Sequence, residues 1–176
     1  KSWADPCLYH KWTDDGLVLW LSWIDDCLCV GSKENVVKSR DEMLRRFDCD
    51  DVGEVKEYLG CKVDIDEENR ALRLTQPVIL QSFLDEFQFP DSGRVQNIPA
   101  VAGSVLTPEV TEDEVLNTEE HAEYRTVVGK LLHVCRWSRP EIWNIVRELT
   151  RAVQKPGRKH MYSAKIVMKY CMETPK

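Results

Sequence analysis

The sequence predicts an α+β fold in which antiparallel β-hairpins with one covering helix come first and three helices follow. Short apolar runs separated by turn residues fill the first part of the chain, which is typical of hairpins. Helical periodicity with capping signals fills the last third. The 176 residues suit about one domain of roughly 100–200 residues, and the 43% of hydrophobic residues can form a core. A large multidomain enzyme and a wholly disordered chain are therefore excluded.

The first predicted strands carry two acidic residues at a turn. Strands are predicted over residues 7–12, 17–24 and 27–31. The turn 13–16 joins the first two, and Asp25-Asp26 separates the second from the third. Because adjacent residues of a regular strand point to opposite faces, the two carboxylates can serve one site only where the backbone turns sharply. We therefore expect a hairpin with Asp25 and Asp26 at its tip.

The other predicted elements are a covering helix, a third hairpin and four further helices. Ser32 can cap a helix that runs to about Phe47. The third hairpin comprises residues 58–66 and 71–75 and precedes a short helix over 77–87. The last three helices are predicted at about 118–136, 139–154 and 158–172, the middle one beginning with a capping box in Ser138-Arg139-Pro140-Glu141. Three regions result, over residues 1–90, 91–117 and 118–176, and the second is a linker punctuated by proline and glycine.

Charge is divided unevenly along the chain. The net charge of −6 combines −14 in residues 1–122 with +8 in residues 123–176. Basic residues that recur with helical periodicity suit contact with a phosphate backbone. The candidates for nucleic-acid binding are Arg136, Arg139, Arg147, Arg151, Lys155, Arg158 and Lys159. The alternative is a solvated helical face that pairs with the acidic part of the chain.

The seven cysteines are odd in number, and no two of them have the CxxC spacing of a zinc or thioredoxin-like site, so we expect free thiols in a reducing compartment. Cys27 and Cys29 are one residue apart, which on a strand places them on the same face. Packing therefore explains them better than metal ligation. The longest apolar run, 17–24, is far shorter than the roughly 20 residues of a membrane-spanning helix, so we expect no membrane partner.

Two carboxylates presented together on a hairpin are hard oxygen ligands. Such ligands suit Mg²⁺, which usually keeps waters and completes its coordination with substrate phosphates. Phosphoryl transfer with two metal ions is the chemistry that such a pair can support. The alternative is that Asp25-Asp26 only makes a polar turn, as Asp14-Asp15 is expected to do.

Several motifs, in order along nearly the whole chain, resemble the reverse transcriptases of copia-type retrotransposons. Trp23-Ile24-Asp25-Asp26 is similar to the aromatic-x-Asp-Asp signature of polymerase palms. The other matching segments are Asp5-Pro6-Cys7-Leu8-Tyr9, Asp51-Val52-Gly53, Tyr58-Leu59-Gly60-Cys61-Lys62-Val63, Leu74-Thr75-Gln76, Tyr124-Arg125, Val128-Gly129-Lys130-Leu131 and Ser138-Arg139-Pro140-Glu141-Ile142, followed by Pro156, His160, Ala164 and Tyr170.

The resemblance implies a role for each matching region. Residues 1–90 would be an incomplete polymerase palm, in which Asp25 and Asp26 are catalytic ligands of Mg²⁺, or of Mn²⁺ in its place. Trp23 would pack beside the primer terminus, and Tyr58, Leu59 and Gly60 would belong to the primer-grip hairpin. Residues 118–176 would form the thumb and connection. The implied partners are an RNA or DNA template-primer duplex, a deoxynucleoside triphosphate and the rest of a Pol polyprotein, in the cytoplasmic virus-like particle of the parent element.

The sequence also departs from the family pattern. The resemblance places the fingers and the first catalytic aspartate before residue 1 and an RNase H domain after residue 176, so we expect the isolated chain to lack polymerase activity. Trp23 stands where the family usually has tyrosine, and Cys27 stands where an aliphatic residue or methionine is commoner. The alternatives are a non-catalytic nucleic-acid-binding module and a degenerate remnant of such an element.

Overall fold

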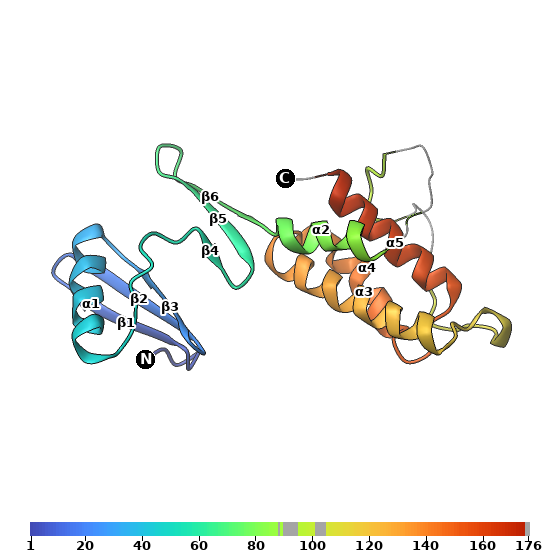
Figure 1. Cartoon of the computed structure of the whole chain (residues 1–176), viewed down its shortest axis with the longest axis horizontal. Helices are drawn as coiled ribbons and strands as arrows, with labels where there is room; N and C mark the ends of the chain where they lie inside the picture. The colour runs from blue at the N-terminus through green and yellow to red at the C-terminus, as the bar shows by residue number, and fades with distance from the viewer. Residues whose placement is uncertain (88, 90–94, 101–104, 175–176) are drawn as a thin grey trace. The chain divides into compact units, whose positions relative to one another are not determined.

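The computed structural model describes residues 1–87, 89, 95–100 and 105–174. The chain divides into two compact units, residues 1–55 and 56–176, which are described separately below. Both contain an antiparallel three-stranded sheet, and most of the helices belong to the second unit (Figure 1). The α+β class predicted from the sequence is therefore confirmed.

The first unit is a β-meander with one helix. Its elements are β1 (Leu8–Thr13), β2 (Gly16–Trp23), β3 (Asp26–Val30) and α1 (Lys33–Arg46). The strand order is β1-β2-β3, and the register pairs Trp23 with Asp26 across the second hairpin. Ser32 caps α1 by accepting a hydrogen bond from the backbone N–H of Asn35, as the sequence predicts.

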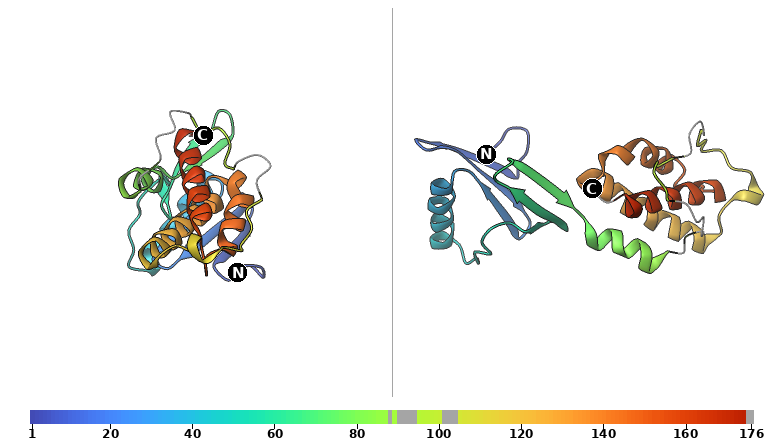
Figure 2. Two further views of the ribbon diagram at one scale, coloured as in Figure 1. Left: turned by 90° about the vertical axis from the view of Figure 1, so that its right-hand side faces the viewer. Right: turned by 90° about the horizontal axis from the view of Figure 1, so that it is seen from above.

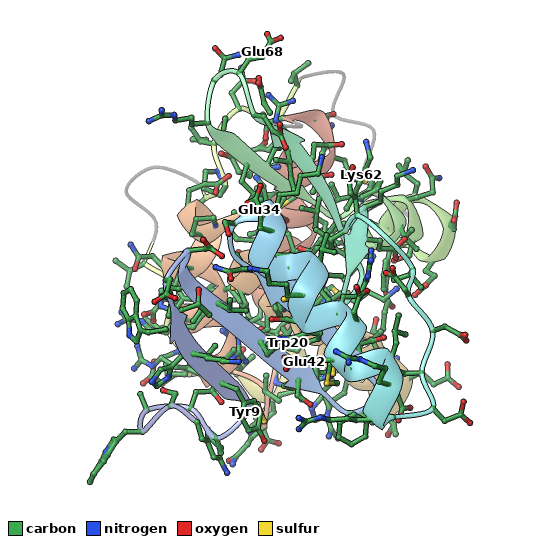
Figure 3. The ribbon with its side chains drawn as sticks, turned by 90° about the vertical axis from the view of Figure 1, so that its left-hand side faces the viewer. Tyr9, Trp20, Glu34, Glu42, Lys62 and Glu68 are labelled. Carbon is green, nitrogen blue, oxygen red and sulfur yellow. The ribbon has the colours of Figure 1, made fainter. Side chains whose placement is uncertain are left out.

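Helix α1 covers one face of this sheet (Figure 3). Val18 is buried on that face, and Thr13 on the same face donates a hydrogen bond to Oδ1 of Asn35 at 3.0 Å. Cys27 and Cys29 also share it, as their spacing predicts, because they pair with Ser22 and Trp20. The core of this unit is small, since Val18 is the one hydrophobic residue of the unit that is fully buried.

The second unit begins with a second meander and continues into helices. Its strands are β4 (Glu57–Tyr58), β5 (Cys61–Asp66) and β6 (Ala71–Thr75), in the order β4-β5-β6. The helices are α2 (Pro77–Glu86), α3 (Thr118–Trp137), α4 (Trp143–Arg151) and α5 (Arg158–Glu173), with 3₁₀ turns η1 (Glu112–Glu114) and η2 (Pro140–Ile142). Figure 2 shows α3, α4 and α5 packed side by side, in agreement with their mutual contacts.

The main hydrophobic core lies between these helices. Phe83 of α2, Tyr124 and Leu131 of α3, Leu149 of α4 and Met168 of α5 are all fully buried in it. Tyr124 donates a hydrogen bond from its hydroxyl to the carbonyl oxygen of Leu149 at 2.8 Å, and burial raises the pKa of this phenol. Within the described residues, no helix is both long and apolar enough to cross a membrane.

Two predicted elements are interrupted in the structure. The strand expected over 58–66 begins only at Cys61, because Leu59 (φ 51°) and Gly60 (φ 76°) form a tight turn between β4 and β5. Positive φ at both central residues is the type I′ geometry that suits a two-residue hairpin. The helix expected over 139–154 is instead η2 followed by α4, which ends at Arg151.

The capping box predicted at Ser138 does not form. The hydroxyl of Ser138 donates to Oε1 of Gln76 at 2.8 Å, so a long-range partner replaces the local one. At the start of α3, by contrast, Asn117 and Glu120 form a capping box, which was not among the predicted features.

The predicted boundaries of the three regions also differ from the contacts in the structure. β4, β5, β6 and α2 belong to the same compact unit as the helices, whereas the sequence groups them with the first strands. Part of the predicted linker is attached to that unit, since Leu116 is buried and its N–H donates to the carbonyl of Pro156 at 3.0 Å. Residues 91–94 and 101–104 of that linker lie outside the described residues.

Candidate active site

The tip of the β2–β3 hairpin places the two predicted acidic residues at a tight turn. β2 ends at Trp23 and β3 begins at Asp26, so Ile24 and Asp25 form the two-residue loop. The predicted hairpin is confirmed, but its turn lies one residue earlier than expected, so Asp25 is in the loop and Asp26 is the first residue of β3. Ile24 has φ 51°, a left-handed conformation that is strained for a β-branched residue. Two-residue hairpin loops usually have glycine where φ is positive. Because isoleucine is at this position instead, the sequence does not predict the left-handed conformation.

Both carboxylates at this tip are available to a ligand. Asp25 and Asp26 are exposed, and within the part of the chain that the structure describes neither has a side-chain hydrogen-bond or ion-pair partner. The acidic turn of the β1–β2 hairpin differs, because Asp15 there pairs with Lys38 at 3.0 Å. The two acidic turns of this sheet are therefore not equivalent.

Asp25 and Asp26 supply two of the oxygen ligands that a hard cation such as Mg²⁺ needs, but not a complete set. Two carboxylates are the number that often binds Mg²⁺ together with waters and substrate phosphates. Among the described residues, no group of three or more His, Cys, Asp and Glu side chains gathers in a way that could hold a metal ion. Asp25 and Asp26 could therefore supply part of a metal site, and the remaining ligands would have to come from other molecules or other chain segments.

Trp23 lies directly beside the acidic pair. It is opposite Asp26 in the register, so the two side chains are on the same face of the sheet, and its side chain is 54% exposed. The indole is therefore accessible on the face that is opposite to the one covered by α1.

The second predicted group, Tyr58, Leu59 and Gly60, forms the β4–β5 turn described above. Tyr58 pairs with Cys61 across this turn, and both Tyr58 and Leu59 are half-buried. These residues belong to the second unit, whereas the acidic pair belongs to the first.

The predicted nucleic-acid-binding residues are mostly on the surface of the helical unit. Arg136 lies on α3, Arg147 and Arg151 lie on α4, Lys155 follows α4 and Arg158 begins α5; all five are exposed. Arg147 and Arg151 both pair with Glu148, at 2.9 and 2.7 Å, and their guanidinium groups hold the pKa of that carboxyl below its usual range. Lys159 is half-buried, and its ammonium group donates to Thr107 Oγ1 and to the carbonyl of Glu109.

The prediction that Arg139 belongs to this nucleic-acid-binding group is wrong. Arg139 is only 3% exposed, and its guanidinium donates to Glu141, to the carbonyl of Cys171 at 3.0 Å and to Thr174 at 2.8 Å. The same group stacks over the ring of Tyr170 at 5.0 Å. Its donors are thus used to join η2 to the end of α5, and it cannot reach a phosphate on the surface. The periodicity of basic residues does not reveal this, because two of its partners lie more than 30 positions away.

Two buried polar residues make contacts that the sequence patterns do not predict. His160 is fully buried, accepts a hydrogen bond at Nδ1 from the N–H of Gly157 and contacts the carbonyl of Thr107 through Nε2 at 2.9 Å. Gln76 is 1% exposed, and among the described residues its Nε2 has no hydrogen-bond partner. The contact of His160 with Gly157 is local, whereas its contact with Thr107 and the contact of Gln76 with Ser138 join distant parts of the chain, so the motifs that contain these residues do not predict them.

Similarity to curated proteins extends over almost the entire chain. It is 26% identical over 99% of its length to a retrovirus-related Pol polyprotein from transposon TNT 1-94 of Nicotiana tabacum. It is 23% identical over 95% of its length to a transposon Ty5-1 protein of Saccharomyces cerevisiae, and 22% identical over 98% to a retrovirus-related Pol polyprotein from transposon RE1 of Arabidopsis thaliana. The relatives of this chain are Pol polyproteins of copia-type and Ty transposons. The resemblance to Pol polyproteins of copia-type retrotransposons is thereby confirmed.

The chain corresponds to a segment of these relatives. It spans 13% of the length of the tobacco protein, 53% of the yeast protein and 11% of the Arabidopsis protein. No protein-family model and no solved structure matches it.

Proposed function

We propose that this chain is part of the reverse transcriptase of a copia-type retrotransposon, and that Asp25 and Asp26 supply metal-binding carboxylates to its active site. The observation that carries the proposal is the β2–β3 hairpin, which presents two unpaired carboxylates beside an exposed tryptophan. The Pol polyprotein relatives support it, since the similarity extends across this hairpin and the helices that follow. The parent polyprotein would act in a cytoplasmic virus-like particle.

In this proposal the chain's own residues bind and orient the reacting groups. When bound, Mg²⁺ supplies the charge that activates an attacking hydroxyl and stabilises the leaving pyrophosphate oxygens, and Mn²⁺ can take its place. Asp25 and Asp26 would hold the cation on a short turn between two paired strands, which limits how far the carboxylates can move. Trp23 would pack against the primer terminus, and the β4–β5 turn at Tyr58, Leu59 and Gly60 would contact the primer strand.

Metal binding at the hairpin tip is the direct test. Mn²⁺ should broaden the amide NMR signals around Asp25 and Asp26 more than those around Asp14 and Asp15, because Asp15 is already paired with Lys38. The double variant Asp25→Asn/Asp26→Asn should abolish the local broadening, whereas Asp14→Asn/Asp15→Asn, the matched control on the same sheet, should retain it. Equal broadening at the two turns would contradict the assignment.

Polymerase activity is tested in a chimera that replaces the matching segment of the tobacco Pol polyprotein with this chain. DNA synthesis from an RNA template, with the unmodified tobacco protein as the reference, should survive in the chimera. It should be lost with Asp25→Asn/Asp26→Asn and persist with Asp14→Asn/Asp15→Asn. Synthesis that is unchanged by the first substitution would refute a catalytic role for these carboxylates.

A non-catalytic nucleic-acid-binding module is the second candidate, and the exposed basic residues favour it. The variant Arg147→Ala/Arg151→Ala should reduce the slope of log K against log salt for duplex binding by about 2, since each phosphate contact contributes roughly 0.9. Arg45→Ala/Arg46→Ala, which removes two exposed arginines from α1, serves as the control. Duplex binding that persists in Asp25→Asn/Asp26→Asn while the chimera makes no DNA would favour this second function.

A further inference from the structure

Residues 105–110, here called the strap, lie against the start of α5. They form no helix or strand and precede η1. Leu106 packs against the main core, and Val110 is so close to Gly157 that a Cβ there would overlap its Cγ1. Two neighbouring residues of α5, Lys159 and His160, also hydrogen-bond the strap. The strap is therefore attached to α5 over a short stretch of that helix.

The hydrogen bonds of His160 determine which ring nitrogen carries the proton. Because a carbonyl oxygen can only accept, Nε2 carries the proton that is donated to the carbonyl of Thr107 at 2.9 Å. Nδ1 is then unprotonated, and it accepts from the N–H of Gly157, the N-cap residue of α5, at 3.0 Å. Both ring nitrogens of this fully buried side chain are in use, and the ring is neutral.

A second proton on this ring is incompatible with the same contacts. It would bind at Nδ1 and point at the N–H of Gly157, so that one donor would face another. It would also place a positive charge in a buried site, which costs free energy unless the charge is paired and hydrogen-bonded. The protonated ring therefore leaves this position, and the bond to Thr107 is lost together with the bond to Gly157.

The charged and titratable groups around His160 do not compensate for this charge. Burial has the largest effect on the imidazole and lowers its pKa; the ammonium group of Lys159 also lowers it, whereas the carboxylate of Glu114 raises it. Tyr124 of α3 presents its ring at 6.5 Å between centroids, but its hydroxyl donates to a carbonyl of α4. The carboxylate of Glu109, on the strap, belongs to an exposed residue.

We infer that the start of α5 is a pH-sensitive latch, which holds the strap while His160 is neutral and releases it when the imidazole takes up a proton. Release exposes the side chains of Leu106 and Val110 without unfolding the helices. Leu116 stays in place, because its N–H donates to the carbonyl of Pro156 and neither nitrogen of the imidazole takes part in that bond. The inference does not depend on the proposed polymerase function.

The test is NMR spectroscopy of the whole chain between pH 7.5 and pH 4.5. The backbone order parameters of Thr107, Glu109 and Val110 should be those of a rigid segment at pH 7.5 and should fall to those of a mobile one in acid. The fall should have the same midpoint as the titration of the His160 ring, below the ordinary value of about 6.5. The amide of Leu116 should stay rigid. Strap order parameters that remain high after His160 is protonated, or a ring that stays neutral at pH 4.5, would overturn the inference.

Histidine variants identify the group that titrates. In His160→Gln the side chain cannot take up a proton, so the order parameters of the strap should not change with pH. His121→Gln is the matched control, because His121 is a half-buried histidine of α3 that bonds a carbonyl outside the strap, that of Val153 at 2.7 Å. This control should keep the acid-induced release. Release that persists in His160→Gln, or that is lost in His121→Gln, would contradict the latch.

Lys159→Met remains decisive where His160→Gln fails to fold. This substitution removes two hydrogen bonds to the strap, to Thr107 Oγ1 at 3.0 Å and to the carbonyl of Glu109 at 2.7 Å. It also removes the positive charge beside the imidazole, so the ring should take up its proton, and the strap should be released, at a higher pH than in the wild type. Lys155→Met, at an exposed lysine before α5, should leave the midpoint unchanged. A midpoint in Lys159→Met at or below the wild-type value would overturn the inference.

Discussion

At the scale of single residues, the strained backbone at Ile24 is the feature most closely connected to the candidate active site. This residue precedes Asp25 in the loop and is held at φ 51° although its side chain is 85% exposed. It therefore gains little from burial while it adopts a conformation that disfavours β-branched residues. Backbone strain of this kind often accompanies functional sites.

The substitution Ile24→Asn should relieve this strain, because asparagine tolerates the left-handed region. We expect the free energy of unfolding to rise by about 1 kcal/mol, measured by urea denaturation. The matched control is Val30→Asn, which changes an exposed β-branched residue on the same sheet at a position with negative φ and should give no gain. An unchanged or lower stability for Ile24→Asn would contradict strain at this position.

His160 is the residue whose titration should affect stability. Burial lowers the pKa of this imidazole, and its Nδ1 is occupied as an acceptor from the N–H of Gly157. The folded state therefore binds the proton less readily than the unfolded state, whose histidine titrates near the ordinary value of about 6.5. The stability that His160 contributes is complete above that pH and is lost as the pH falls from there through the lower pKa of the folded state.

The variant His160→Gln should remove this part of the pH dependence. We expect the free energy of unfolding to change less between pH 7 and pH 5 in the variant than in the wild type. At pH 7 the variant should be less stable by about 1–3 kcal/mol, since buried hydrogen bonds are lost. Urea denaturation at several pH values measures both effects. His10→Gln, at an exposed histidine, should keep the pH dependence of the wild type.

At the scale of secondary-structure elements, the chain before α5 is held close to the start of that helix. Val115 forms an isolated bridge with Gly157, and Pro156 accepts a hydrogen bond from Leu116. A Cβ at Gly157 would overlap Cγ1 of Val110 and lie 3.2 Å from the carbonyl oxygen of Glu114. Glycine is therefore required here by close packing, since its φ of −117° is open to any residue.

Gly157→Ala should consequently destabilise the chain by about 1–3 kcal/mol, as overpacking does elsewhere. The matched control is Gly129→Ala on α3, where a Cβ meets nothing within 4 Å and alanine should add roughly 0.5–1 kcal/mol of helix stability. Thermal and urea denaturation of both variants gives the comparison. Similar effects from the two substitutions would show that the packing around Gly157 is not restrictive.

The elements also show which features can be predicted from the sequence. Turn residues such as Thr13 to Gly16 and Asp25-Asp26 locate the first two hairpins correctly, because turn chemistry is local. The Leu59-Gly60 turn is missed because it interrupts an apolar run that resembles one strand. Ser138 looks like a cap by local pattern, yet it bonds Gln76, which is 62 positions away. Patterns that depend on long-range partners cannot be seen in one sequence.

The candidate sites also contain some residues that local sequence chemistry predicts and others that depend on long-range contacts. The position of Asp25 and Asp26 at a turn follows from local chemistry, and the exposure of most of the basic residues follows from helical periodicity. Arg139 does not, because its burial depends on Cys171 and Thr174 at the far end of α5. The contact of Gln76 is equally hidden, since it forms where a strand, a helix start and the segment after α3 meet.

At the scale of the whole molecule, the two units differ in how much apolar surface they bury. Every residue of the main core belongs to the second unit, where α2, α3, η2, α4 and α5 supply its fully buried side chains. The first unit buries Val18 and Asn35, and the side-chain nitrogen of Asn35 has no hydrogen-bond partner among the described residues. Because burial is the main source of stability, the first unit should open more easily.

Hydrogen exchange measures this difference directly. We expect amides of α3 and α5 to exchange far more slowly than those of β1, β2 and β3, because the helices can open only by disrupting the main core. Val167→Ala, at a fully buried position of α5, should lower the free energy of unfolding by about 1 kcal/mol or more. The free energy of exchange of the α3 amides should fall by the same amount. The same substitution should leave the exchange of β2 unchanged where the two units open independently. Parallel loss of protection in β2 and α3 would show that they open together, and the hairpin that carries Asp25 and Asp26 would then be stabilised by the helical core.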